Sequence, residues 1–418
     1  MRDDGARRLH VTVVDSDLPY PSNSGKRLRS LNLVLPLAKR HAITYIARVG
    51  DAAEGKIADA FLRDHGIEPI LVGEPLASKS GAKFYGRLAR NLVSSMPYSA
   101  ELHITPGMKA AVADHAKRRP IDVMQLEHVN YLYCHEGLDC PLVVQAHNIE
   151  SLIWKRMAAT TANPVAKAYF SLQCARYHRF EQTAFHQIDR VVAVSEADAA
   201  LARGLYRAPR VAVVDNGVDI AGFRNVVPVV GSRQVLFLGA LDWRPNLDAI
   251  EQLLGSILPA LRAKVPDAHL AIVGRKPSER LRRAIAGAEG ASLHADVPDT
   301  RPFMAASAVM AVPLRIGGGS RLKILESLAA SLPVVSSTVG AEGLELTPGR
   351  DLVIADPTGA FVDALADAIT HPDRARDMAL KGRDTVTARY DWPMLADRLE
   401  AVWVAAIADR KARHTSSR

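Results

Sequence analysis

Cysteine is scarce in this sequence of 418 residues, which has only Cys134, Cys140 and Cys174. The three form no Cys-x-x-Cys pair and no even set, so a disulfide framework is not expected and a reducing compartment fits better. The sequence also lacks an apolar run long enough to span a bilayer. Its first ten residues are polar and contain no run resembling a signal peptide. We therefore expect a soluble cytoplasmic protein, or one that associates peripherally with the inner face of the cell membrane.

Short repeats and low-complexity tracts are missing as well. The contents of 48% hydrophobic and 23% charged residues are ordinary for a globular protein, and the length suits two domains. A net charge of +8 and a pI near 9.4 favour anionic partners, which include phosphorylated substrates, acidic lipid surfaces and nucleic acid. Because the basic residues are spread along the chain and no nucleic-acid motif is present, we do not expect nucleic acid as a partner.

Strand and helix patterns alternate in the N-terminal half. The run His10–Asp15 is rich in β-branched residues, a turn leads to Gly25, and a helical pattern follows up to Ala38. The next strand is expected at Ala42–Ala47. This order is typical of a parallel sheet with helical crossovers. Later strands are expected at Ile70–Val72, Val123–Leu126, Leu142–Ala146 and Val191–Val194.

The pattern breaks near Asn216 and then starts again. New strands are expected at Val235–Leu238, His269–Val273, Ala308–Pro313 and Pro333–Ser336. We therefore predict an α/β protein with two doubly wound domains. The expected parts are a first domain of residues 1–218, a linker of 219–232, a second domain of 233–390, and a C-terminal segment of 391–418 whose helix packs back on the first domain and ends in a frayed tail.

The most informative motif follows the strand that ends at Pro313. It consists of three glycines, a serine and two cations, namely Gly317, Gly318, Gly319, Ser320, Arg321 and Lys323. Ser320 can cap the following helix, and the backbone amides of such a loop can approach a diphosphate closely. Glu326, on the same helix, can accept hydrogen bonds from ribose hydroxyls. The alternative interpretation is a glycine-rich turn followed by a surface Lys–Glu pair.

Residues 313–340 resemble the donor signature of the retaining glycosyltransferases of family 4, which have the GT-B fold. That signature has two glutamates separated by seven residues, and Glu326 matches the second, which binds the ribose. Gly318 stands at the place of the first glutamate. Some members of the family have such a glycine-rich version, in which backbone amides lie near the donor.

The resemblance covers nearly the whole chain and implies a fold and an activity. The implied architecture is GT-B, with two doubly wound Rossmann-like domains that face each other across a cleft. The implied activity is retaining transfer from a nucleotide-sugar, such as a UDP- or GDP-sugar, to a glycan or lipid-linked saccharide in polysaccharide or glycoconjugate synthesis. No metal or other cofactor is expected, because fixed amides and cations would stabilise the departing diphosphate.

Two more segments resemble donor contacts of the family. In Phe237–Asn246, Ala240 replaces the arginine that follows the glycine in many members, and the later lysine is missing. Arg244 is the candidate substitute, although the segment also fits a turn followed by a helix cap. Val297 lies where family members read the nucleotide base through backbone atoms.

The first domain opens its first helix with Ser24 and Gly25. Two small residues at this place let the backbone of family members come close to the donor phosphates and the acceptor. Lys26, Arg27 and Arg29 make this helix unusually cationic. The alternative interpretation is a solvated basic face.

Three residues at strand ends are candidates for the chemistry. His147 ends a strand, where a histidine can bind substrate hydroxyls or carry a developing charge, although a structural histidine is the alternative. Glu127 and His128 follow the strand Val123–Leu126. Family members have an important histidine in this loop, and the alignment can place it at either residue.

Residues 79–96 form an amphipathic basic pattern, with apolar residues at every fourth position. Phe84, Leu88 and Leu92 belong to the apolar stripe, and Lys83 and Arg90 lie between them. Such a helix can lie on an anionic membrane. The interpretation that we favour is a helix that packs this stripe on the sheet.

Two other functions compete with transfer. A nucleotide-sugar epimerase of the same fold would need several acidic and histidine side chains that converge on the sugar, and the sequence shows no such set. A transferase-like protein that binds a nucleotide-sugar without activity fits the missing glutamate, arginine and lysine. Tight binding of the donor without turnover would identify it.

Overall fold

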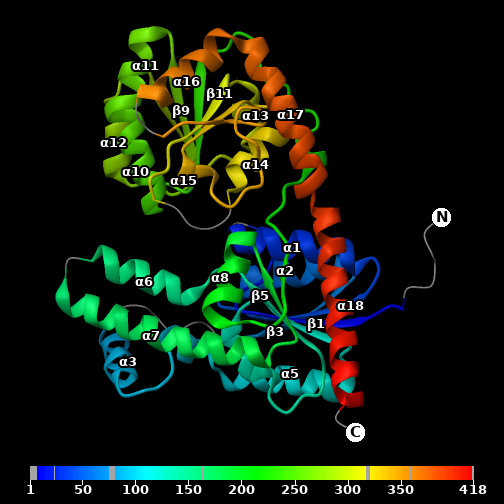
Figure 1. Ribbon diagram of the computed structural model, residues 1–418. Coiled ribbons are helices and arrows are strands. Elements are labelled where there is room, and N and C mark those ends of the chain that lie inside the picture. The colour runs from blue at the N-terminus through cyan, green and yellow to red at the C-terminus, as the bar shows by residue number, and fades with distance from the viewer. Residues whose placement is uncertain are drawn as a thin grey trace. The chain divides into compact units, whose positions relative to one another are not determined.

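The computed structural model describes residues 7–22, 24–74, 81–161, 163–316, 321–356 and 359–416. The chain forms two compact units. Unit 1 consists of residues 1–215 and 393–418, and unit 2 consists of residues 216–392. Each unit is built on one parallel β-sheet with helices packed against it (Figure 1).

The sheet of unit 1 has seven parallel strands in the order β3-β2-β1-β4-β5-β6-β7. The strands are β1 (His10–Asp15), β2 (Ala42–Arg48), β3 (Ile67–Val72), β4 (Val123–Leu126), β5 (Leu142–Ala146), β6 (Arg190–Ala193) and β7 (Val211–Val213). β4 and β5 are buried at every position, as expected for central strands that are covered on both faces.

The helices of unit 1 connect these strands or extend from them. They are α1 (Gly25–Ala38), α2 (Ala52–Asp64), α3 (Ala82–Leu92), α4 (Tyr98–His103), α5 (Pro106–Arg118), the 3₁₀ helix η1 (Val129–His135), α6 (Glu150–Thr160), α7 (Pro164–Gln187), α8 (Glu196–Tyr206) and α18 (Trp392–Ser416). The pair α6 and α7 forms a long helical hairpin that extends beyond the sheet (Figure 1).

Unit 2 repeats the same plan with a six-stranded parallel sheet in the order β10-β9-β8-β11-β12-β13. The strands are β8 (Gln234–Leu238), β9 (His269–Gly274), β10 (Ala291–Ala295), β11 (Val309–Val312), β12 (Val334–Ser336) and β13 (Val353–Ile354). The helices are α9 (Ile220–Phe223), α10 (Arg244–Gln252), the π-helical turn η2 (Leu253–Ile257), α11 (Leu258–Lys264), α12 (Glu279–Ala286), α13 (Arg301–Ala305), α14 (Leu322–Ala329), α15 (Thr338–Ala341), α16 (Gly359–Thr370) and α17 (Pro372–Tyr390).

The strand orders locate the place where each sheet binds ligands. In unit 1 the order reverses between β1 and β4, and in unit 2 it reverses between β8 and β11. In open α/β sheets, ligands bind at the carboxyl ends of the strands beside such a switch point. Ligands are therefore expected at the loops after β8 and β11 in unit 2 and at those after β1 and β4 in unit 1.

The chain enters and leaves unit 2 at adjacent points. The amide N–H of Val218 donates to the carbonyl oxygen of Tyr390 at 2.8 Å, and Val218 also bridges Asp391. The boundary at Asp215 precedes the expected connection of residues 219–232, which lies within unit 2 and includes α9.

The C-terminal helix is longer than the sequence predicts. α18 does not fray after Asp409 but continues to Ser416. Arg410 and Arg413 hold this last part, because both form ion pairs with Asp189, a carboxylate with 0% exposure. Arg410 also binds Asp139 at 2.6 Å. A buried carboxylate needs such partners, and they stabilise the end of the helix.

Helix α3 does not pack its apolar stripe on the sheet, contrary to the interpretation that the sequence favours. Its only buried residue is Asn91, which accepts a hydrogen bond from Gln173 on α7 at 2.8 Å. Arg176, also on α7, donates to the carbonyl oxygens of Asn91 and Leu92. Polar bonds therefore fix α3 against α7, and Tyr85, Leu92 and Val93 remain exposed.

Candidate active site

The expected donor loop lies at the carboxyl end of β11, beside the switch point of unit 2. β11 is fully buried, and α14 begins at Leu322. Gly317, Gly318, Gly319 and Ser320 lie outside the described residues, and so does the helix cap expected from Ser320. The residues on both sides of this segment are held by side-chain contacts.

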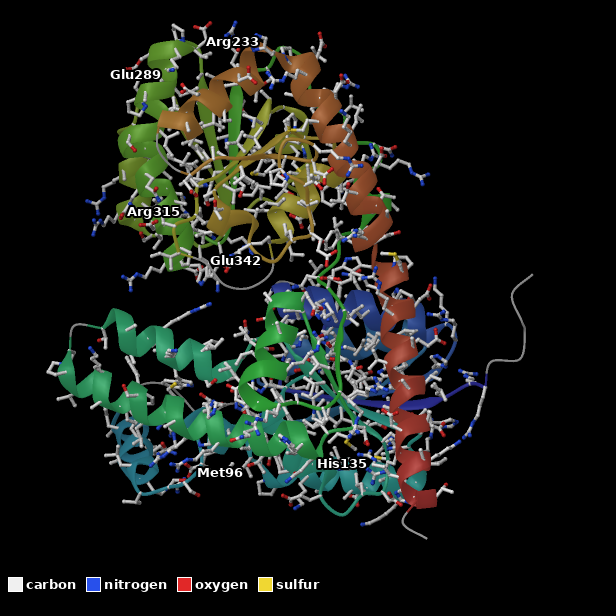
Figure 2. The ribbon with its side chains drawn as sticks, in the orientation of Figure 1. Met96, His135, Arg233, Glu289, Arg315 and Glu342 are labelled. Carbon is white, nitrogen blue, oxygen red and sulfur yellow. The ribbon has the colours of Figure 1, made fainter. Side chains whose placement is uncertain are left out.

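Arg315 and Arg321 anchor the two ends of the loop. Arg315 binds Asp248 on α10 through Nε at 3.1 Å and Nη2 at 2.5 Å. Arg321 is only 5% exposed, its Nη2 donates to the carbonyl oxygen of Val339 at 2.8 Å, and Glu342 lies 3.7 Å away. Arg315 and Glu342 lie at the same end of unit 2 (Figure 2). The guanidinium group of Arg321 was expected to bind the donor phosphates, and in the structure it forms a hydrogen bond to α15.

Lys323 lies on the first turn of α14 and points toward β8. Its Nζ donates to Oδ1 of Asn246 at 3.0 Å and lies 4.5 Å from the centre of the Phe237 ring. Burial, together with the charge of Arg321, lowers the pKa of Lys323 to about 7. Burial also raises the pKa of Glu326, although the nearby Lys323 opposes this. The site therefore holds an ammonium group that water solvates poorly and that an anion would stabilise.

Asn246 connects the loop after β8 with α14, a role that the sequence did not indicate. Its Nδ2 donates to the carbonyl oxygen of Ala240 at 2.9 Å, while its Oδ1 accepts from Lys323. Gly239 makes the approach feasible, because a Cβ there would lie 2.5 Å from Nδ2 of Asn246. Gly274 is equally crowded, since its Cβ would lie 1.9 Å from the carbonyl oxygen of Gly239. The available signal was a glycine after one strand, an asparagine in the first turn of the following helix and a second glycine at the end of the next strand.

The other two donor candidates are Arg244, at the start of α10, and Val297, in the loop after β10. Arg244 is exposed at the first residue of α10. Val297 packs against the core of unit 2 just after Asp296, whose φ of 54° is in the left-handed region. Oδ1 of Asp296 accepts from the backbone N–H of Lys276 at 3.1 Å, so the loops after β9 and β10 are tied together.

In unit 1, Ser24 and Gly25 begin α1 as the sequence predicts. The Ser24 side chain caps the helix by accepting from the backbone N–H of Arg27 at 3.3 Å. Lys26 then reaches back to the end of β1, where it binds Asp15 and donates to Oγ of Ser16 at 2.8 Å. Burial opposes the charge of Lys26, but Asp15 and Asp17 raise its pKa.

The basic face of α1 is neither solvated nor free. Arg27 pairs with Glu54. Arg29 is 1% exposed and donates to the carbonyl oxygens of Val214 at 2.6 Å and Asp215 at 2.5 Å. Burial lowers the pKa of Arg29 to about 10. The alternative of a solvated basic face is thus wrong for Arg29, while the approach of the backbone at Ser24 and Gly25 to the substrates stays a prediction.

Glu127 and His147 meet at the carboxyl ends of β4 and β5. Nε2 of His147 lies 3.1 Å from Oε2 of Glu127, which also accepts from Ser30 at 2.6 Å, while Gln125 donates to Oε1 at 2.5 Å. Burial disfavours the charge of Glu127, but these donors lower its pKa to about 2. Burial, partly offset by Glu127, lowers the pKa of His147. The neutral ring of His147 then carries its proton on Nε2 and presents Nδ1 as an acceptor.

His128 belongs to a second pair. Its Nε2 lies 3.2 Å from Oε1 of Glu150 on α6, and its Nδ1 accepts from the backbone N–H of Asn130 at 3.2 Å. The ring of His103 stacks beside it with centroids 5.9 Å apart. Burial lowers the pKa of His103 to about 4. Glu127 and His128 therefore face different partners, and Glu127 is the one that contacts His147.

The two units thus offer different chemistry. Unit 2 presents a buried cation and crowded backbone at its switch point, which suits a diphosphate. Unit 1 presents an imidazole acceptor held by an ionised carboxylate, which suits a hydroxyl group. Among the described residues, no three His, Cys, Asp or Glu side chains are grouped so that they could hold a metal ion.

Two family models match successive parts of this chain. A family model described as "Glycosyl transferases group 1" matches residues 232–371, and one described as "Glycosyltransferase Family 4" matches residues 58–221. Sucrose-phosphate synthase from Thermosynechococcus elongatus has a similar fold, with a TM-score of 0.69 at 15% identity, over 96% of this chain and 100% of that one.

Two relatives are similar in sequence. An uncharacterized 44.6 kDa protein in the cps region of Klebsiella pneumoniae is 21% identical over 395 residues, which cover 91% of this chain and 96% of the relative. A GDP-mannose-dependent monoacylated alpha-(1-6)-phosphatidylinositol monomannoside mannosyltransferase of Corynebacterium glutamicum is 28% identical over 206 residues, covering 44% of this chain and 53% of the relative. The matched region thus spans about half the length of that enzyme.

The fold is therefore that of the GT-B glycosyltransferases, with two Rossmann-like sheets. The chain belongs to glycosyltransferase family 4, whose members transfer sugars from nucleotide-sugar donors.

Proposed function

We propose that this enzyme transfers a sugar, with retention of configuration, from a UDP- or GDP-sugar bound on unit 2 to a glycan or lipid-linked saccharide bound on unit 1. The observation that carries the proposal is the cluster of Lys323, Asn246 and Phe237 at the switch point of unit 2. A poorly solvated ammonium group, placed next to a glycine-rich loop and a helix start, favours a dianionic ligand.

On unit 2, Lys323 and the backbone amides of residues 317–320 would bind the diphosphate and stabilise its charge as it leaves. Glu326, whose carboxylate lies on the same helix, would accept hydrogen bonds from the ribose hydroxyls. The backbone near Val297 would contact the base, and Arg244, which is exposed, would reach the outer phosphate oxygens.

On unit 1, His147 would accept a hydrogen bond from a substrate hydroxyl through Nδ1, while Glu127 holds the ring. Ser24 and Gly25 would let the backbone of α1 approach the reacting sugar. His128, paired with Glu150, would bind a further hydroxyl group. Hydrogen-bonding groups that are held in place orient polyhydroxylated ligands, because each one fixes the direction of a hydroxyl group.

Two relatives support the kind of donor and acceptor. The Corynebacterium enzyme is named for GDP-mannose and a phosphatidylinositol mannoside, so a lipid-linked acceptor fits a similar chain. The Klebsiella protein is named for the cps region, which agrees with a role in polysaccharide synthesis.

A thermal-shift panel with UDP, GDP, ADP and dTDP tests the donor site. At about one hundred times its dissociation constant, the correct nucleotide should stabilise the folded state by about 2.7 kcal/mol. If none of the four shifts the melting temperature at millimolar concentration, the proposed donor site is wrong. The matching nucleotide-sugar is then incubated with candidate acceptors. Tight binding without release of nucleotide would identify a non-transferring binding protein, and a changed free nucleotide-sugar would identify an epimerase.

We also propose that α3 places the enzyme on the anionic inner face of the cell membrane. None of the described helices is long and apolar enough to cross a membrane. Tyr85 on α3 and Val93 at the C-cap of α3 are 68% and 90% exposed, and Lys83 and Arg90 lie on this helix. Exposed apolar residues among basic ones are typical of helices that lie at a lipid surface.

Sedimentation with vesicles tests this association. Vesicles rich in phosphatidylglycerol should bind the protein, those of phosphatidylcholine should bind it weakly, and Val93→Glu should weaken binding about tenfold. Val404→Glu is the matched control, because Val404 is 54% exposed on α18 and no part of α3. Equal binding to both lipids, or equal losses in both variants, would contradict a membrane role for α3.

A further inference from the structure

A chain of buried hydrogen bonds connects the C-terminal helix to His147. Trp403 on α18 has 0% exposure, and its indole N–H donates to Oε1 of Gln125 at 2.7 Å. Nε2 of Gln125 donates to Oε1 of Glu127 at 2.5 Å. Oε2 of the same carboxylate accepts from Nε2 of His147 at 3.1 Å. Trp403 and Gln125 are 278 residues apart in sequence, so only the packing of α18 brings them together.

The direction of each hydrogen bond from Trp403 to Glu127 is fixed. An indole N–H can only donate, so it selects the orientation of the Gln125 amide in which the oxygen faces Trp403. The NH₂ group of Gln125 must then point to Glu127. In the opposite orientation the amide oxygen would face the carboxylate and leave the indole N–H unpaired. The repulsion between the two oxygens and the unpaired N–H would both destabilise the buried site, because no water can replace the lost bonds.

We propose that Trp403 is a positioning residue for His147, which acts through Gln125 and Glu127 to keep the imidazole neutral with Nδ1 as an acceptor. This inference rests on the proposed function, in which His147 accepts a hydrogen bond from a substrate hydroxyl. Trp403 itself contacts no substrate, and its effect is electrostatic and orientational.

The balance of charge around His147 explains why one neutral bond matters. Glu127 favours the imidazolium form, while Lys26 and Arg29 on α1 oppose it, and Ser30 donates to the same carboxylate. Each donor on Glu127 spreads its negative charge and weakens its pull on the imidazole proton. When the indole N–H is removed, Gln125 loses its orientation and more of that charge acts on His147. The pKa of His147 then rises, so its Nδ1 is protonated and becomes a donor at a higher pH than in the wild type.

The test replaces the indole while it keeps an aromatic ring. In Trp403→Phe, the pKa of His147 should rise by about 0.5 to 1, measured by NMR titration of ¹³Cε1-labelled histidine. The His147 signal is assigned by its loss in His147→Gln. Trp392→Phe is the matched control, because Trp392 lies on the same helix, is 4% exposed and takes no part in the series of hydrogen bonds from Trp403 to His147. In transfer assays, the acidic limb of the kcat profile should move to higher pH by the same amount, so kcat on that limb should fall about threefold to tenfold in Trp403→Phe, with the KM for the donor unchanged.

A second variant keeps the proposal testable if Trp403→Phe does not fold. Gln125→Met removes the amide but keeps an unbranched side chain of similar length, and it should raise the pKa of His147 in the same way. An unchanged His147 titration in both variants, or an equal shift in Trp392→Phe, would overturn the proposal. A shifted titration with unchanged kcat would also overturn it. If the wild type transfers no sugar, the proposed function fails, while the titration still decides whether Trp403 controls His147.

Discussion

Replacing Lys323 with methionine is expected to weaken binding of the nucleotide diphosphate about a hundredfold at pH 7. A hydrogen bond to a charged group contributes about 1.5 to 3 kcal/mol, and each 1.4 kcal/mol corresponds to a factor of ten in affinity. The ammonium group lies beside the Phe237 ring and is held by one neutral hydrogen bond to Asn246. A diphosphate would therefore be its main source of stabilisation. Isothermal titration calorimetry with the nucleotide selected by the thermal-shift panel measures the change.

The lowered pKa of Lys323 predicts how donor binding depends on pH. Burial and Arg321 lower the pKa of Lys323 to about 7 in the free protein, and a bound diphosphate would raise it again. Above pH 7 the free lysine is mostly neutral and the bound one is charged, so binding takes up a proton. The dissociation constant should then increase by up to about tenfold per pH unit between about pH 7.5 and 9.

Calorimetry in two buffers with different ionisation enthalpies counts that proton directly. Lys264→Met is the matched control, because it removes the same charge from α11, where Lys264 is exposed and pairs with Asp363. It should bind the nucleotide like the wild type. A wild-type affinity that is constant from about pH 7.5 to 9 would show that Lys323 does not bind the phosphates.

Replacing His147 with glutamine is expected to lower kcat about a hundredfold to a thousandfold and to leave the donor dissociation constant unchanged. The amide nitrogen of glutamine can take the place of Nε2 and keep the hydrogen bond to Glu127. The acceptor at Nδ1 is lost. The variant therefore removes the expected contact with the substrate hydroxyl and preserves the buried bond behind it.

The pH profile of kcat separates this role from a structural one. The pKa of His147 is lowered by burial, so the ring remains neutral at neutral pH and becomes protonated only on acidification below its ordinary value of about 6.5. Activity should be lost as the pH falls through this lowered pKa, and the glutamine variant should lack this dependence.

A buried histidine elsewhere in unit 1 provides the control. His115 on α5 is 6% exposed, burial lowers its pKa, and its Nε2 lies 3.1 Å from Oγ1 of Thr12. His115→Gln should cost stability, measured by urea unfolding, and leave kcat and its pH profile intact. Equal kcat losses in the two variants would mean that His147 is only a structural residue.

The sequence alone was sufficient for the alternation of strands and helices. The strands expected at Val123–Leu126 and Leu142–Ala146 coincide with β4 and β5. Central strands of a parallel sheet are buried on both faces, so they are short apolar runs bounded by polar residues. The edge strands β7, β10 and β13 escaped prediction, because β7 and β10 are only partly buried and β13 spans just Val353–Ile354.

The loop that we propose for the donor was also recognisable in the sequence, since a glycine-rich segment between a strand and a helix is a local pattern. The direction of its side chains was not. Arg321 and Lys323 are two residues apart and equally basic in sequence, yet one braces Val339 and the other turns toward Asn246. Successive positions on a helix start face different neighbours, and only the packed neighbours decide which cation remains for a ligand.

The sequence by itself determined the class of fold, the family resemblance and the residue types at the strand ends, because these depend on patterns within a few residues. The tertiary structure decided which of them meet. It placed Asn246 against Lys323 across 77 residues, chose Glu127 over His128 as the partner of His147, and brought Trp403 to Gln125 across 278 residues. For Asn246 and Lys323 the physical reason is the strand order, because a sheet that winds outward from its centre in both directions joins loops that are distant in the chain. For Trp403 the reason is the packing of α18 within unit 1.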